Sequence, residues 1–383
     1  MKIIVPMAGM GKRMRPHTLT VPKPLIPIAG KPIVQRLVED IAKVCGEPVD
    51  EVAFIIGRFG EAVEKSLVKI AESVGAKGTI VYQDEPLGTA HAILCAKESL
   101  TGPLVVAFAD TLFKADFTLD SSVPGTIWVQ QVADPKPFGV VKLDAQGRIT
   151  DFVEKPQTFV SDLAIIGIYY FQDGEYLRTE LQYLLDNNIM DKGEYQLTNA
   201  LENMKNKGTV FVPGRVTEWL DCGNKDATVF TNQRYLEYLK ERGESLVAES
   251  AIITNSVLLE PVYIGENAVI TDSVVGPHVS LGAHANVRDS RLSNSIVQQS
   301  ASVLNAVITN SMIGNFATVT GTPSRSAKIC GQTELREPPP DNTASVKCTP
   351  ADTSVSMWRR CSKATPSNSA RSMCPLVCQP MMP

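Results

Sequence analysis

The chain has 383 residues, is 44% hydrophobic and 20% charged, and carries a formal net charge of −4. This length and composition suit two or three globular domains, and the weak negative charge speaks against nucleic acid or an anionic membrane as a partner. The longest apolar runs, such as residues 103–109, fall far short of the roughly 20 residues of a membrane span. Residues 1–6 are too short for the core of a secretion signal, so we expect a cytoplasmic protein.

Strands and helices are predicted to alternate in the first part of the chain. Apolar runs predict strands at 2–8, 52–56, 79–82 and 104–109, and helical spacing predicts helices at 33–44, 61–74 and 89–100. This order indicates an α/β domain with a largely parallel sheet. Ligands of such sheets bind beyond the carboxyl ends of the strands, so Gly9, Gln83 and Asp110 should face one rim.

A mixed pattern follows and completes the first domain. Strands are predicted at 127–132, 139–143, 149–154 and 164–171, and helices at 175–186, 194–205 and 226–242. The predicted N-terminal domain therefore covers residues 1–242.

Residues 243–321 are predicted to form a second domain with an internal repeat. Aliphatic residues recur about every six positions from Ile264 to Val319, with few charges between them. This period is typical of a parallel β-helix, and at about eighteen residues per coil it gives about three to four coils. Residues 322–383 lose the repeat and are rich in Pro, Ser and Cys, which indicates either a disordered tail or an aberrant, frameshifted end.

The basic residues gather near the N-terminus, where residues 1–38 hold seven Lys and Arg and no acidic residue. The segment 7–13 reads Met-Ala-Gly-Met-Gly-Lys-Arg, and Pro-Lys-Pro-Leu (22–25) and Gly-Lys-Pro (30–32) follow at short distances. Small residues let the backbone approach a nucleotide so that its N–H groups bind phosphate oxygens. Arg13 and Lys23 add the charge that a triphosphate needs.

These motifs resemble the signature of the sugar-1-phosphate nucleotidylyltransferases, in the long form that carries a C-terminal hexapeptide β-helix. The resemblance covers residues 1–242 well. It implies an α/β fold: a Rossmann-like nucleotidyltransferase domain with a mixed, mainly parallel sheet, followed by a short left-handed parallel β-helix. The pattern departs from the family at Met7, at Lys12 and in the segment 194–199.

The resemblance also implies roles for individual residues. Nucleotide contacts are implied for Ala8, Gly9, Met10, Gly11, Gln83, Gly88 and Thr89. Contacts to the sugar phosphate are implied for Phe138, Gly139, Glu154, Lys155 and Gly167. Catalytic roles are implied for Arg13, Lys23, Asp110 and Lys155, with Asp110 and Asp221 as ligands of a Mg²⁺ cofactor. His91 is expected to be a helix residue without a chemical role.

The function that follows is the joining of dTTP or UTP to glucose 1-phosphate, most specifically by a glucose-1-phosphate thymidylyltransferase. The partners are then small-molecule substrates, and the solenoid suggests a homo-oligomer. A mannose-1-phosphate guanylyltransferase is the alternative within the class. Outside it, the alternatives are a hexapeptide acyltransferase using His278 or His284 as general base, and a non-catalytic regulatory paralogue.

Overall fold

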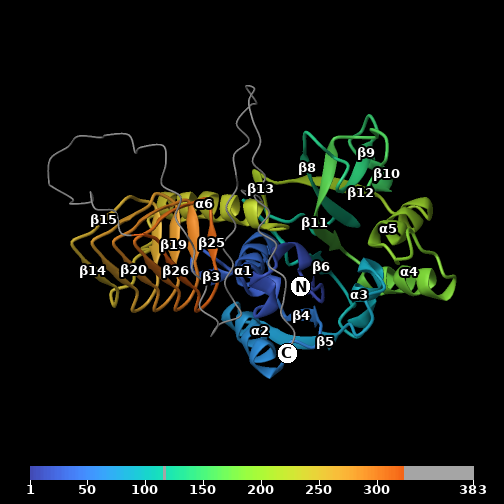
Figure 1. Cartoon of the computed structure of the whole chain (residues 1–383). Coiled ribbons are helices and arrows are strands. Elements are labelled where there is room, and N and C mark those ends of the chain that lie inside the picture. Colours follow the sequence, from blue (N-terminus) through green and yellow to red (C-terminus); the bar gives the residue numbers. More distant parts are fainter. Residues whose placement is uncertain (115–117, 323–383) are drawn as a thin grey trace, which may run out of the picture.

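A nine-stranded mixed sheet forms the centre of the N-terminal part of the computed structural model, which describes residues 1–114 and 118–322 (Figure 1). Its order is β10-β9-β11-β6-β1-β4-β5, with β8 paired to β11 and β12 paired to β8. The strands are β1 Lys2–Pro6, β4 Glu51–Ile56, β5 Lys77–Tyr82, β6 Leu104–Ala107, β8 Gly125–Gln131, β9 Gly139–Leu143, β10 Ile149–Glu154, β11 Leu163–Phe171 and β12 Phe211–Arg215. Strands β1, β4, β5 and β6 run parallel, and β11 joins β6 antiparallel. The α/β, mixed-sheet prediction is confirmed.

Two small strand pairs lie outside this sheet. The first joins β2 Pro27–Ile28 to β3 Lys31–Pro32, and the second joins β7 Thr111–Lys114 to β13 Glu218–Asp221. The second pair was missed by the sequence patterns, because β7 pairs with a strand about a hundred residues further along the chain. It is this pair that brings the two predicted metal ligands together.

Six α-helices form in the described residues: α1 Ile33–Cys45, α2 Glu61–Ser73, α3 Thr89–Cys95, α4 Gly174–Asp186, α5 Leu197–Asn206 and α6 Lys225–Glu241. Four agree with prediction to within one or two residues, but α3 and α5 do not. The helix α3 ends early because residues 96–99 close with short-range turn bonds toward β6. The helix α5 starts three residues late because the backbone of Tyr195 is bonded to Leu87 and Ala90 instead. None of the helices of the described part is long and apolar enough to cross a membrane.

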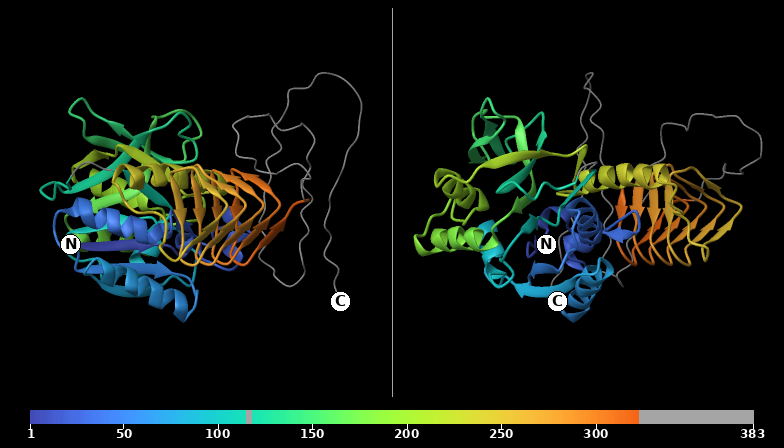
Figure 2. Two further views of the ribbon diagram at one scale, coloured as in Figure 1. Left: turned by 90° about the vertical axis from the view of Figure 1, so that its left-hand side faces the viewer. Right: turned by 180° about the vertical axis from the view of Figure 1, so that it is seen from behind.

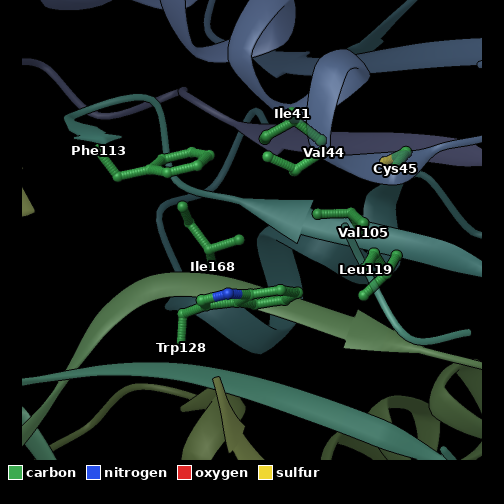
Figure 3. A pocket seen from close by; sticks show the side chains of 8 residues that line it. All are labelled: Ile41, Val44, Cys45, Val105, Phe113, Leu119, Trp128 and Ile168. Atoms are coloured by element: carbon green, nitrogen blue, oxygen red, sulfur yellow. The ribbon is translucent and has the colours of Figure 1, made fainter. Parts of the chain in front are cut away.

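The core of this domain lies where α1 packs on the sheet. The residues of α1 that point inward recur at helical spacing, and Leu37, Ile41 and Cys45 are buried among them. Figure 3 shows a small space left at this contact, which is lined by Ile41, Val44, Cys45, Val105, Phe113, Leu119, Trp128 and Ile168. Its lining holds no charged side chain, so this space is a feature of packing and not of chemistry.

The C-terminal part of the described chain is a parallel β-helix, as predicted. Its three sheets hold β14-β17-β20-β23-β26, β15-β18-β21-β24 and β16-β19-β22-β25. The strands are β14 Ile252–Thr254, β15 Val257–Leu258, β16 Val262–Ile264, β17 Val269–Thr271, β18 Val274–Val275, β19 Val279–Leu281, β20 Asn286–Arg288, β21 Arg291–Ser293, β22 Ser295–Val297, β23 Ser302–Leu304, β24 Val307–Thr309, β25 Met312–Ile313 and β26 Thr318–Thr320.

The coils of the β-helix are shorter than predicted. Successive coils are offset by 17 and later by 16 residues, not eighteen, so that four full coils and the first strand of a fifth fit. One corner of each coil is turned by a single residue in the left-handed region, with φ of 46° to 49° at Asn255, Asp272, Asp289 and Asn305. Asn and Asp tolerate this conformation, which makes a tight corner. The domain boundaries at 242 and 321 stay predictions, and residues 323–383 of the predicted tail lie outside the described residues.

The β-helix packs along α6 and the loop before α1 (Figure 2). Asn232 of α6 is fully buried there, and its Oδ1 accepts from the backbone N–H of Ala29 at 2.9 Å and from Ser280 Oγ at 2.8 Å. The ring of Tyr263 lies against Gly30, so close that a Cβ at Gly30 would fall 2.1 Å from it. The contact is therefore a specific interface built from both parts of the chain.

Replacing Asn232 by Ala should lower the free energy of unfolding by about 2 kcal/mol, because two buried donors lose their acceptor. Urea denaturation of the two proteins measures the difference. Gln233→Ala is the matched control on the same helix, since its amide makes only a 3.4 Å contact with Glu237. Equal losses for the two variants would contradict a specific role for Asn232.

Candidate active site

The glycine loop after β1 offers an open backbone surface. Gly11 has φ of 56° and its carbonyl accepts from Thr18 Oγ1 at 2.9 Å. A Cβ at Gly11 would lie 3.0 Å from Lys23 Cβ, so this position brings the loop close to Lys23. At Gly9 a Cβ would meet no atom within 4 Å. Ala8 and Met10 flank it, and Met10 is 62% exposed, so a ligand can reach the backbone of this loop.

Lys23 is held beside Asp110 at the carboxyl ends of β1 and β6. Its Nζ lies 2.8 Å from Asp110 Oδ2, and its side chain is only 10% exposed, whereas that of Asp110 is 41% exposed. Burying a lysine stem fixes where its charge sits, and the aspartate offsets the loss of hydration. The pair therefore presents one positive and one negative group to the rim of the sheet.

Asp221 lies next to this pair because β13 runs antiparallel to β7. The backbone N–H of Cys222 donates to Asp110 O at 2.9 Å, and Asp221 Oδ1 accepts from Gly223 N–H at 2.8 Å. Burial raises the pKa of the Asp221 carboxyl, and the negative charge of Asp110 raises it further, while Lys23 and Arg13 oppose the shift. The structure thus brings Lys23, Asp110 and Asp221 together, with the positive charge of Arg13 acting on Asp221.

Two crowded carboxylates are a fitting pair of ligands for a divalent cation, which would relieve their repulsion. Across the described ranges no group of three or more His, Cys, Asp or Glu side chains is placed to hold a metal. The remaining ligands would have to come from a substrate or water, as is usual for Mg²⁺ at phosphates.

The loop 83–89 forms a second wall of the site, and the segment 194–197 supports it. Gly88 has φ of 111°, and a Cβ there would fall 2.4 Å from the carbonyl oxygen of Tyr195. Thr89 Oγ1 accepts from Leu197 N–H at 2.9 Å and donates to Gln196 Oε1 at 3.1 Å. Only glycine at position 88 allows the backbone to approach Tyr195 this closely. Tyr195 and Gln196 were missed as site residues because their role depends on backbone contacts far along the chain.

Gln83 sits at the end of β5 with its amide turned toward this loop. Its Nε2 lies 3.3 Å from Gly88 O and 3.1 Å from His91 Nδ1. His91 is a residue of α3, as expected, and it contacts the predicted base-reading side chain directly.

Residues predicted for the sugar phosphate lie on the antiparallel side of the sheet. Phe138 packs edge-on against Trp219, with ring centroids 5.0 Å apart. Gly139 leaves room for Glu154, since a Cβ at Gly139 would fall 3.0 Å from Glu154 Oε2 and 3.6 Å from Thr198 Cγ2. Thr198 Oγ1 is buried and has no hydrogen-bond partner in the described part of the chain. The predictions overlooked both Trp219 and Thr198.

Lys155 and Gly167 complete this side. Lys155 has φ of 43°, its N–H donates to Phe138 O, and its Nζ lies 3.1 Å from Glu154 Oε1. Its side chain is 53% exposed and makes no contact with Lys23 or Asp110 among the described residues. Gly167, with φ of 86°, accepts from the N–H of Phe108, two positions before Asp110.

The family model described as nucleotidyl transferase matches residues 2–237, which include all these side chains. The chain belongs to the nucleotidyl transferase family. Among known proteins, it is 32% identical over 270 residues to the low-salt glycan biosynthesis nucleotidyltransferase of Haloferax volcanii, covering 68% of this chain and 72% of that protein. The family resemblance inferred from the sequence motifs is confirmed.

Relatives named for different activities match about equally well. Identity is 30% over 277 residues with the mannose-1-phosphate guanyltransferase beta-B of Xenopus laevis (68% of this chain, 72% of that protein). It is 30% over 288 residues with the glucose-1-phosphate thymidylyltransferase of Streptomyces antibioticus (69% and 78%). A solved UDP-glucose pyrophosphorylase in complex with UDP-glucose shares 25% identity at a TM-score of 0.50, covering 62% of this chain and 98% of that one. This nucleotidyltransferase is therefore of the sugar-1-phosphate type.

The two histidines considered for acyl transfer occupy corners of the β-helix coils. His278 has φ of 63° and its Nε2 lies 3.0 Å from Glu237 Oε1 of α6, so it takes part in the contact between the two parts of the chain. His284 has φ of 58° and is exposed. The contact with Glu237 gives His278 a structural role.

Asp221→Asn should raise the free energy of unfolding of the metal-free protein at neutral pH, because burial disfavours the ionised carboxylate. Below the ordinary Asp pKa of 3.8 the group is protonated in both folded and unfolded chains, so the gain should be absent there. It should develop as the pH rises through the raised pKa of the folded protein. Urea denaturation with a chelator, over a pH series, measures it.

Asp84→Asn is the control, for which the opposite change in the free energy of unfolding is expected. The Arg58 guanidinium, 2.8 Å away, holds the pKa of Asp84 below its usual value, so ionisation favours the folded state there. Asp84→Asn should lower stability at neutral pH. A loss of stability for Asp221→Asn under the same conditions would contradict the electrostatic description of the site.

Proposed function

We propose that this nucleotidyltransferase joins dTTP or UTP to glucose 1-phosphate, giving an NDP-glucose and pyrophosphate. The observation that carries the proposal is the cluster of Lys23, Asp110 and Asp221 beside the open glycine loop at one rim of the sheet. Positive and negative groups side by side suit a reaction that needs both a metal and neutralisation of phosphate charge.

In the proposed reaction a phosphate oxygen of the sugar 1-phosphate attacks the α-phosphorus in line. The bond from the α-phosphorus to the bridging oxygen breaks, and pyrophosphate leaves with that oxygen and the electron pair. The protein contributes positioning and charge more than covalent chemistry. The glycine loop and Arg13 bind the triphosphate, Lys23 neutralises charge at the α-phosphate, and Lys155 holds the sugar phosphate. Glu154 accepts hydrogen bonds from the sugar hydroxyls.

Asp110 and Asp221 are the proposed ligands of Mg²⁺. When bound, the ion supplies Lewis-acid neutralisation of the oxygens on the reacting phosphate. The Nζ of Lys23 lies 2.8 Å from Asp110 Oδ2. A cation that binds Asp110 would replace this contact, and the Lys23 ammonium could then turn to the phosphate.

The preference for uracil or thymine rests on the loop 83–88. Gln83 Oε1 and the N–H of Gly88 have no hydrogen-bond partner within residues 1–114 and 118–322. A free acceptor beside a free donor complements the N3–H and a neighbouring carbonyl of these bases. Phe138 and Gly139 would lie against the sugar ring, with Gly167 behind them.

A mannose-1-phosphate guanylyltransferase is the second candidate. The observation that favours it is the 30% identity with the Xenopus laevis relative, which equals that with the Streptomyces antibioticus thymidylyltransferase. Guanine also carries an N–H on its pairing edge, so Gln83 suits it as well. The presence of Arg13, Lys23, Asp110 and Asp221 in one cluster disfavours a non-catalytic paralogue, because a protein that only binds nucleotide has no need of them all. A homo-oligomer stays a prediction.

Pyrophosphate release with Mg²⁺ tests the proposal directly. Five nucleoside triphosphates (dTTP, UTP, GTP, CTP and ATP) are crossed with glucose 1-phosphate, mannose 1-phosphate and N-acetylglucosamine 1-phosphate. We expect the highest kcat/KM with dTTP or UTP and glucose 1-phosphate. Preference for GTP and mannose 1-phosphate would establish the second candidate, and no turnover by folded protein would establish the non-catalytic one.

Asp110→Asn should lower kcat by about a hundredfold or more at saturating substrates, because it removes a metal ligand that acts on the reacting phosphate. The shape of the side chain is kept, together with an oxygen that can accept from Lys23. Steady-state pyrophosphate release measures the effect, with Asp186→Asn on the exposed end of α4 as the matched control. A kcat near that of the unaltered protein would show that Asp110 is not a metal ligand.

A further inference from the structure

His91 makes two contacts, one with Gln83 of the loop 83–89, here called the base loop, and one within helix α3. Its Nδ1 lies 3.1 Å from Gln83 Nε2, and its Nε2 lies 4.0 Å from Cys95 Sγ, one helical turn further on. The imidazole is therefore placed between the proposed base-reading amide and a half-buried thiol. None of the proposed catalytic steps uses this histidine.

With a neutral imidazole, the contacts of this group favour one arrangement of protons. Gly88 O, 3.3 Å from Gln83 Nε2, can only accept, so the amide must turn its NH₂ group toward it. The same NH₂ group then donates its second hydrogen to His91 Nδ1. A neutral imidazole that accepts at Nδ1 carries its proton at Nε2, which faces Cys95. Burial raises the pKa of the Cys95 thiol, so the sulfur there stays uncharged and can accept weakly.

Both hydrogens of the Gln83 amide are then in use, which leaves Oε1 as the group offered to a nucleotide. An oxygen attracts a base that presents N–H at its pairing edge, as uracil and thymine do at N3. Cytosine presents a lone pair at N3, which the same oxygen repels. Without the bond to His91, the amide would be held only by the longer contact to Gly88 and would turn more easily.

We propose that His91 is a positioning residue which, by holding the Gln83 amide, selects uracil and thymine nucleotides against CTP. The inference rests on the proposed function, in which Gln83 reads the base. It makes nucleotide selectivity a property of the first turn of α3 as well as of the loop that contacts the base.

His91→Phe tests the proposal, because phenylalanine keeps a ring of similar shape and removes the acceptor. The ratio of kcat/KM for UTP to that for CTP should fall about fivefold, the effect of one neutral hydrogen bond. The change should appear mainly in KM for UTP, since Lys23, Asp110 and Asp221 are untouched. His91→Gln, which supplies a carbonyl acceptor, should recover much of the ratio. An unchanged ratio in His91→Phe, or a fall in kcat alone, would overturn the proposal.

A double-mutant cycle with Gln83→Ala separates this role from a general effect on folding. If His91 acts through Gln83, its removal should change the UTP to CTP ratio little once Gln83 is absent, whereas additive losses would overturn the inference. Binding of UTP alone, measured by calorimetry, gives the same comparison without turnover. His284→Phe, the same change at an exposed corner of the β-helix, is the matched control. Failure of the unaltered protein to use UTP or dTTP would sink the proposed function itself, and is thereby distinguished from failure of the His91 variants.

Discussion

The pairing of β7 with β13 is the constraint on which the candidate active site depends. Asp110 stands just before β7 and Asp221 ends β13 opposite Thr111, so the antiparallel ladder brings the backbone of the two aspartates close together. Burial is the main cause that raises the pKa of Asp221, and repulsion from Asp110 raises it further. Lys23 and Arg13 offset part of the repulsion. In the proposed reaction a metal would take over the carboxylates while the cations turn to phosphate.

The base loop depends on a different kind of contact. Its shape is held by main-chain and hydroxyl bonds between residues 87–90 and 195–197, which require the left-handed glycine at Gly88. Behind the loop, α3 supplies His91 to the amide of Gln83. The proposed nucleotide side of the site is therefore fixed by backbone contacts, and the Gln83 amide is the side chain proposed to face the base.

The β-helix is tied to the site through α6. This helix follows Gly223 directly, and Thr231 Oγ1 in its second turn donates to the carbonyl of Asp221 at 2.8 Å. Its neighbour Asn232 is bonded to Ser280 of the β-helix and to the loop before α1. One helix thus fixes the backbone of a proposed metal ligand and also anchors the solenoid. The coils, which carry few charges, pack against α6 and hold it in place.

Local patterns in the sequence were sufficient for the fold class, most helices, the β-helix and the glycine loop with Lys23, because periodicity and short motifs depend on near neighbours in the chain. Asp110 and Asp221 were also singled out from their motifs as candidate metal ligands. Tertiary structure alone decided that β7 exists, that residues 194–196 are not helical, and that a coil needs 16 or 17 residues. It also decided that His91 touches Gln83. Each of these depends on backbone or side-chain partners whose positions are set by the packing of the chain, and local propensity carries no information about them.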